Sequence, residues 1–171
     1  MLPKLTIQQL LTQTDWGELD FLIVDMPPGT GDIQLTLAQR VPLAGAVIVT
    51  TPQDIALLDA RKGIEMFRKV AVPVIGIVEN MSTHVCNNCG HEEAIFGHGG
   101  GEAVAGDYET ELLGQLPLTL QLREQSDAGA PIVIADPDAP TSVTIREVAV
   151  KVQTFVEQNM TKAPVINIFN D

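Results

Sequence analysis

The chain has 171 residues, of which 45% are hydrophobic, and a mean hydropathy of +0.17; these values fit one packed domain and exclude a disordered protein. The formal net charge of −12 opposes non-specific binding to nucleic acid or to an anionic membrane. No apolar stretch is long enough to span a bilayer and no signal peptide opens the chain, so we expect a cytoplasmic protein.

The first predicted strand covers residues 21–25, an apolar run that ends at Asp25. Such a run is typical of a strand buried on both faces of a parallel sheet. Pro27 and Pro28 end it, because proline cannot donate a ladder hydrogen bond. Asp25 is therefore expected at the carboxyl end of a buried strand, where open α/β sheets bind their ligands.

Helical patterns alternate with further strands along the rest of the chain. One helix is expected to open at Thr51-Pro52-Gln53-Asp54, where Thr51 is the capping residue and Pro52 occupies the first helical position. Two more helices are expected over 120–128 and 141–158. This alternation predicts an α/β fold with parallel pairing. The remaining strands are predicted at Ala46–Thr50, 74–78, 112–116 and Ile132–Ala135. Core-facing positions are predicted at Leu57, Ala60, Ile64 and Phe67 in the first helix and at Ile145, Val148, Ala149, Val152, Phe155 and Val156 in the last.

The segment 82–101 breaks this alternation and is expected to form an excursion from a single domain that covers residues 1–160. It holds both cysteines, all three histidines and five of the glycines. Its glycine-rich end, 97–101, is superficially similar to a dinucleotide loop, but no strand precedes it. We therefore expect a return into a short helix near 103–108. Residues 161–171 are expected to form a loosely attached tail.

Cys86 and Cys89 are spaced so that two thiolates can bind one metal centre. A structural zinc ion or a cubane iron–sulfur cluster needs four ligands, which two chains related by a two-fold axis would supply. Three alternatives stay open: a zinc site in one chain completed by His84 and His91, a redox pair, and two unligated thiols.

A phosphate site is indicated only in part. Gly29 and Gly31 allow the backbone after Asp25 to bring N–H groups close to a phosphate. Asn80 follows another buried strand and is a candidate for a contact to a base, although a turn-forming asparagine is equally consistent with its position. No Gly-x-x-x-x-Gly-Lys-Ser/Thr sequence occurs in the chain.

With these motifs in place, the chain resembles the Mrp/ApbC family of iron–sulfur cluster carriers, which are relatives of the MinD-type deviant Walker P-loop ATPases. The resemblance covers about residues 16–159, and its combination of motifs is specific. The matching segments are Val24-Asp25-Met26-Pro27-Pro28-Gly29-Thr30-Gly31-Asp32, Thr50-Thr51-Pro52-Gln53-Asp54, Val78-Glu79-Asn80-Met81-Ser82, Cys86-x-x-Cys89-Gly90, Phe96-Gly97 with Gly99-Gly100, and Leu113-Gly114-Gln115-Leu116-Pro117-Leu118.

The resemblance implies a homodimer that holds a labile 4Fe–4S cluster between two pairs of Cys86 and Cys89 and passes it to client apo-iron–sulfur proteins. It also implies binding of ATP and Mg²⁺. Asp25 would match the Walker B aspartate, Gly29 the switch glycine and Asn80 the adenine contact. The implied fold is a doubly wound, mostly parallel sheet with flanking helices.

The chain departs from this family in lacking the N-terminal half that carries the glycine-rich loop. We therefore do not expect it to hydrolyse ATP alone. The absent strand would lie between 21–25 and Ala46–Thr50, so these two strands are expected to pair directly, or the chain to aggregate or recruit a partner.

A zinc-binding dimer module is the first competing function. A MinD/ParA-like ATPase acting on membrane or DNA is the second, and the acidic charge disfavours it.

Overall fold

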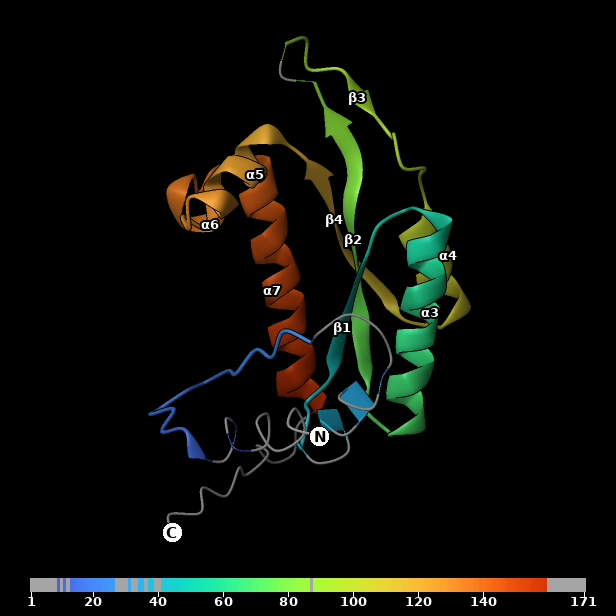
Figure 1. Cartoon of the computed structure of the whole chain (residues 1–171), viewed down its shortest axis with the longest axis vertical. Helices are drawn as coiled ribbons and strands as arrows, with labels where there is room; N and C mark the ends of the chain where they lie inside the picture. The colour runs from blue at the N-terminus through green and yellow to red at the C-terminus, as the bar shows by residue number, and fades with distance from the viewer. Residues whose placement is uncertain are drawn as a thin grey trace.

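The computed structural model describes residues 9, 11, 13–26, 31, 34–35, 37–38, 41–86 and 88–159. Gly29, its neighbours in 27–30 and the tail 161–171 lie outside these residues. The named elements follow the alternating order expected of an α/β fold (Figure 1). They are β1 (Ala46–Thr50), α3 (Asp54–Lys69), β2 (Val74–Val85), β3 (Glu92–Glu93), α4 (Gly100–Asp107), β4 (Glu111–Leu118), α5 (Leu120–Asp127), α6 (Ile132–Ala135) and α7 (Pro140–Asn159).

The sheet is built around β2, which lies between β1 and β4 and pairs in parallel with both. β3 pairs antiparallel with the far end of β2. The three parallel strands are joined through α3 and α4, as parallel pairing requires a crossover. The prediction of a mostly parallel sheet with flanking helices is therefore confirmed.

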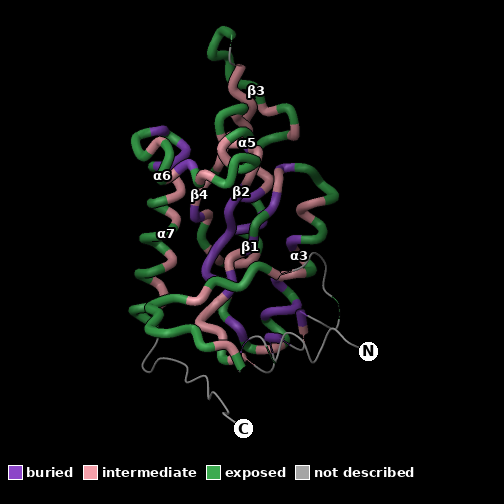
Figure 2. The backbone as a smooth tube through the Cα atoms, turned by 60° about the vertical axis from the view of Figure 1, so that its left-hand side comes forward, coloured by how far each residue is buried: buried purple, intermediate pink, exposed green. Residues whose placement is uncertain are grey.

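Two hydrophobic cores lie on opposite faces of the sheet, with α3 and α4 over one face and α7 over the other (Figure 1). Ile64, Ile77 and Val104 are fully buried on the α3 and α4 face. Leu113 and Val78 pack against Val148 and other apolar residues of α7 on the second face. The buried residues gather along the sheet and α3, whereas much of α7 is exposed (Figure 2). No helix in the described ranges combines the length and the hydrophobicity needed to cross a membrane.

The predicted strand at 21–25 is wrong. These residues form neither helix nor strand, and Phe21 and Ile23 are 46% and 81% exposed. A strand is stable only when its backbone groups pair with a neighbour. Within the described part of the chain β1 pairs only with β2, so the expected direct pairing of 21–25 with Ala46–Thr50 is also wrong. The outer edge of β1 has no strand beside it among these residues.

Three local predictions also need correction. Ile132–Ala135 is the short helix α6, because a brief apolar run fits a strand and a partly buried helix equally well. Helix α3 begins at Asp54 with Gln53 as its N-cap, so Thr51 does not cap it; Thr51 Oγ1 instead donates a hydrogen bond to Gln53 Oε1 (3.3 Å). Ala149, predicted in the core, is exposed on α7.

Candidate functional site

The two cysteines lie at the turn of a hairpin that projects beyond the sheet (Figure 1). β2 continues past its pairing with β1 and meets β3 in only two pairs, His84 with Glu93 and Val85 with Glu92. The N–H of Cys86 then donates to the carbonyl oxygen of His91 (2.9 Å), and the N–H of Gly90 donates to that of Cys86 (2.8 Å). These two bonds close the turn and present its tip to solvent.

The turn favours the thiolate form of Cys86. The backbone N–H groups of Asn88 and then Cys89 hydrogen-bond the Cys86 sulfur and lower the pKa of its thiol, and the Cys89 side chain adds to the effect. Partial burial opposes it. Cys86 is half-buried, Cys89 is exposed, and neither forms a disulfide. Because the thiolate is the metal-binding and nucleophilic form, this geometry suits a metal or cluster ligand.

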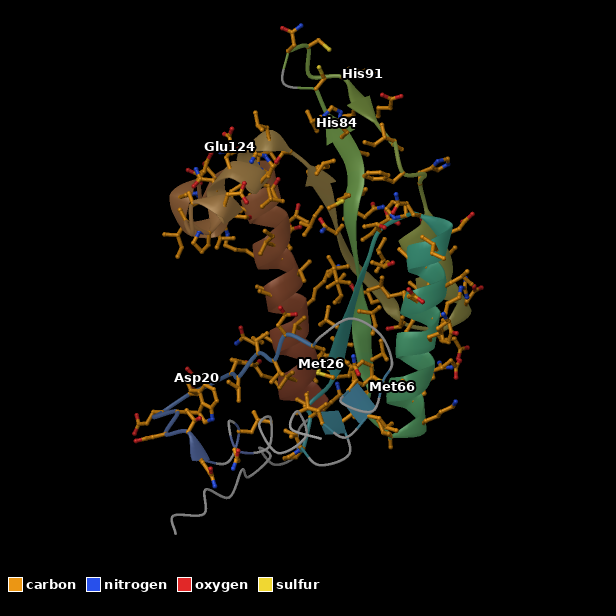
Figure 3. The ribbon with its side chains drawn as sticks, in the orientation of Figure 1. Asp20, Met26, Met66, His84, His91 and Glu124 are labelled. Carbon is orange, nitrogen blue, oxygen red and sulfur yellow. The ribbon has the colours of Figure 1, made fainter. Side chains whose placement is uncertain are left out.

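His84 and His91 lie on the two arms of the hairpin below the cysteine turn (Figure 3). In the described residues, no group of three or more histidine, cysteine, aspartate or glutamate side chains is arranged to hold a metal ion. The zinc site completed within one chain by His84 and His91 is therefore not formed there. Cys86 and Cys89 are free thiols.

Asp25 does not lie where the sequence placed it. It is exposed in the irregular segment that replaces the predicted strand. The adjoining Met26 lies in the half of the molecule opposite the hairpin (Figure 3). The structure therefore does not bring Asp25 to the carboxyl ends of β1, β2 and β4, where Asn80 lies. Gly29 is outside the described residues, and the nucleotide roles of Asp25 and Gly29 stay predictions.

Asn80 is half-buried in β2. Its Oδ1 accepts a hydrogen bond from the N–H of Met81 (3.0 Å), a residue with a φ of 55°. Positive φ is unfavourable for methionine, and this local bond supports it. The ladder with β4 is irregular between Asn80 and His84. Asn80 thus lies inside β2, which continues to Val85, and not in a turn, and the adenine contact stays a prediction.

The neighbouring Glu79 was not selected by the sequence analysis, although a charged residue within an apolar strand was a visible signal. It is 1% exposed and lies between Thr50 and Gln115 in a row across β1, β2 and β4. Its Oε2 accepts from the N–H of Gly101 (2.6 Å) and its Oε1 from Nε2 of Gln115 (2.7 Å). Thr50 is the last residue of β1, so the row lies at the carboxyl end of that strand.

The sequence of the chain is similar to that of known protein families. Residues 2–153 match the family model ParA, described as NUBPL iron-transfer P-loop NTPase. The chain is 64% identical over 142 residues to the iron-sulfur cluster carrier protein of Pseudomonas fragi, covering 83% of this chain and 50% of that protein. It is 52% identical over 146 residues to the mouse (Mus musculus) iron-sulfur cluster transfer protein NUBPL, covering 85% and 46%. The chain thus spans about half the length of these curated relatives.

Solved structures support the same fold. A nucleotide-binding protein from Archaeoglobus fulgidus, in complex with ADP, superposes with a TM-score of 0.64 at 39% identity, covering 74% of this chain and 54% of that one. The septum site-determining protein MinD of Pyrococcus horikoshii, complexed with Mg-ADP, gives a TM-score of 0.67 at 20% identity, covering 94% and 60%. The second likeness concerns the fold alone.

Proposed function

The chain belongs to the ParA family of NUBPL-type iron-transfer P-loop NTPases, and on that premise we propose that Cys86 and Cys89 bind a 4Fe–4S cluster for delivery to client apo-proteins. The observation that carries the proposal is the projecting turn that holds both thiols, with the pKa of Cys86 lowered. A ligand pair on an exposed tip can both receive and release its cargo.

The cluster is proposed to lie between two copies of the chain. A cubane cluster takes four thiolates, and one chain offers two. A tip that extends beyond the sheet lets two hairpins meet around a two-fold axis without a clash between the domains. Dimer formation is therefore expected to depend on the cluster.

Anaerobic reconstitution of the full chain with iron and sulfide tests this function. The wild-type protein should develop thiolate-to-iron charge-transfer absorption, with about two irons and two sulfides per chain. Cys86→Ala and Cys89→Ala should lose the absorption, whereas His84→Ala, changed on the same hairpin, should keep it. Analytical ultracentrifugation should show a dimer only with cluster bound. Zinc without sulfide in protein purified anaerobically would instead favour the zinc-binding dimer module.

We also propose that nucleotide is bound near the carboxyl ends of the strands, with Asn80 as the contact to adenine. Asp25, expected to serve phosphate and Mg²⁺ together with Gly29, is exposed in the other half of the molecule and is not part of this proposed site. The likeness to the Archaeoglobus protein in complex with ADP supports this part. Because the sequence lacks the Gly-x-x-x-x-Gly-Lys-Ser/Thr cradle, binding without hydrolysis is expected. Titration with a fluorescent ADP analogue should show weaker binding to Asn80→Ala. Equal binding to both proteins would remove Asn80 from the site.

A further inference from the structure

Glu79 is a buried acid that closes the cysteine excursion at its base. Its carboxylate accepts the N–H of Gly101 at 2.6 Å, across 22 positions of sequence. The chain between these two residues, 80–100, contains the whole hairpin with Cys86 and Cys89. One hydrogen bond therefore joins the middle of β2 to the first turn of α4, and the whole hairpin lies between these two positions.

The returning helix α4 fits closely against this contact. A Cβ atom added at Gly101 would lie 3.0 Å from Glu79 Oε2 and Cβ, and one added at Gly100 would lie 2.6 Å from Leu57 Cδ1. The start of α4 is thus held between the Glu79 carboxylate and helix α3. Because these contacts are so close, the start of α4 can take only one position against the sheet.

The carboxylate suits this place electrostatically. Gly101 lies in the first turn of α4, where a negative charge is favoured by the helix dipole. Gln115 on β4 satisfies the second oxygen at 2.7 Å. None of the ion pairs found among the described residues includes Glu79, so these polar donors compensate its charge. Hydrogen bonds to a buried charge are the strong kind in proteins.

On its β2 side the excursion is also held by β4, through the pairing of His84 with Leu118 and the hydrogen bond from Ser82 Oγ to the carbonyl oxygen of Leu116 (3.2 Å). The hairpin contains two strand pairs and the turn bonds of Cys86. A short two-stranded ribbon is marginally stable by itself. We propose that Glu79 is a positioning residue for the cysteine site: its carboxylate fixes the start of α4, where the excursion ends, against β2 and so sets the direction in which Cys86 and Cys89 meet the thiols of a second copy. This inference rests on the proposed cluster function.

Two substitutions at Glu79 separate the effect of its hydrogen bonds from the effect of its side-chain packing. Glu79→Leu keeps the volume but leaves the Gly101 N–H and the Gln115 amide without acceptors. Glu79→Gln can keep both bonds, since its carbonyl oxygen can accept from Gly101 and its amide can donate to a rotated Gln115 side chain. Rescue by glutamine would show that the bonds, rather than bulk packing, position the hairpin.

Hydrogen exchange of the full chain without metal supplies a readout independent of the cluster. In Glu79→Leu, amides of 82–99 should exchange about tenfold faster, and Cys89 should be alkylated faster, whereas Glu79→Gln should stay near wild type. Ser142→Ala is the matched control, because its buried hydroxyl also holds two segments through Ile132 (3.1 Å) and Asp136 (2.6 Å), away from the hairpin. It should affect α6 and α7 only.

Reconstitution with iron and sulfide then tests whether the position of the hairpin affects cluster uptake. Glu79→Leu should take up less cluster than Glu79→Gln and give a broadened electron paramagnetic resonance signal after reduction. Unchanged exchange over 82–99 in Glu79→Leu, or an equal rise in Ser142→Ala, would overturn the positioning role. If Glu79→Leu does not fold, Gly101→Ala disturbs the same contact from the opposite side, and unchanged exchange there would also overturn the role. Wild-type protein that takes up no cluster would instead refute the proposed function and leave the exchange result valid.

Discussion

The N–H of Cys86 and the carbonyl oxygen of His91 form a 2.9 Å hydrogen bond across the turn that carries both thiols. This bond sets the backbone of the turn so that the N–H groups of Asn88 and Cys89 point to the Cys86 sulfur. The backbone of the turn therefore lowers the pKa of the Cys86 thiol.

The Cys86 thiol should react at lower pH in the folded chain than in the unfolded chain. Its folded-state pKa is lowered, first by the Asn88 N–H, so the thiolate stabilises the fold above the unfolded pKa. That contribution is lost as the pH falls through the folded pKa. The pH dependence of the alkylation rate in Cys89→Ser, which leaves one cysteine, measures it. The same variant in urea is the reference, and identical midpoints in the two states would contradict the prediction.

Amide hydrogens of 21–26 should exchange at close to the rate of an unfolded chain. This segment forms no described strand, and Ile23 is 81% exposed. In β1, every second amide should be protected, because one edge of that strand is bonded to β2. Hydrogen exchange read by mass spectrometry distinguishes the two segments. Strong protection of both would mean that 21–25 pairs in solution.

Val49→Lys should reduce self-association of the chain. Val49 is 64% exposed on β1, an apolar strand with no strand beside its outer edge among the described residues. Such edges promote pairing between molecules, and a lysine blocks it. The change in unfolding free energy should stay within about 0.5 kcal/mol.

Light scattering over a concentration series measures this association. Ile48→Lys is the contrasting variant, since Ile48 is 8% exposed and its replacement should unfold the chain. Equal scattering by Val49→Lys and wild type would show that the edge does not drive association.

Gly101→Ala and Gly106→Ala should have opposite effects on stability although both lie in α4. The new Cβ at Gly101 would lie 3.0 Å from Glu79, and we expect a loss of about 1–3 kcal/mol. At Gly106 no atom lies within 4 Å, so alanine should add about 0.5–1 kcal/mol through its helix propensity. Urea unfolding followed by circular dichroism gives both values. Stabilisation by Gly101→Ala would show that the contact with Glu79 is looser than described.

The sequence predicted the elements whose pattern is local and strong. Ala46–Thr50 was found to the residue, and 112–116 lies within β4. Ala60, Ile64 and Phe67 lie in the core as the helical spacing of α3 indicated. Helix ends were harder: α3 begins after Gln53, whose backbone is extended, and no side-chain hydrogen bond caps it there.

The apolar run at 21–25 shows why pattern alone is insufficient. Its composition is that of a buried strand, but burial requires a neighbouring strand and a covering helix, which the described residues do not supply. The prediction of a strand at Ile132–Ala135 was wrong for a related reason. This segment is a helix, and the hydroxyl of Ser142 on α7 donates to the carbonyl oxygens of Ile132 and Asp136 at its two ends. In both cases distant residues decided the conformation.

By itself, the sequence determined the α/β class, the central apolar strands and the identity of the thiol pair, because these depend on residue type and on spacing within a few positions. Only the tertiary structure decided that the thiols lie on a projecting turn, that Asp25 lies apart from Asn80, and that Glu79 joins β2 to the start of α4. These relations depend on which residues meet after β2, α4 and β4 pack together. A carboxylate buried by residues 22 and 36 positions away leaves no periodic signal in the chain.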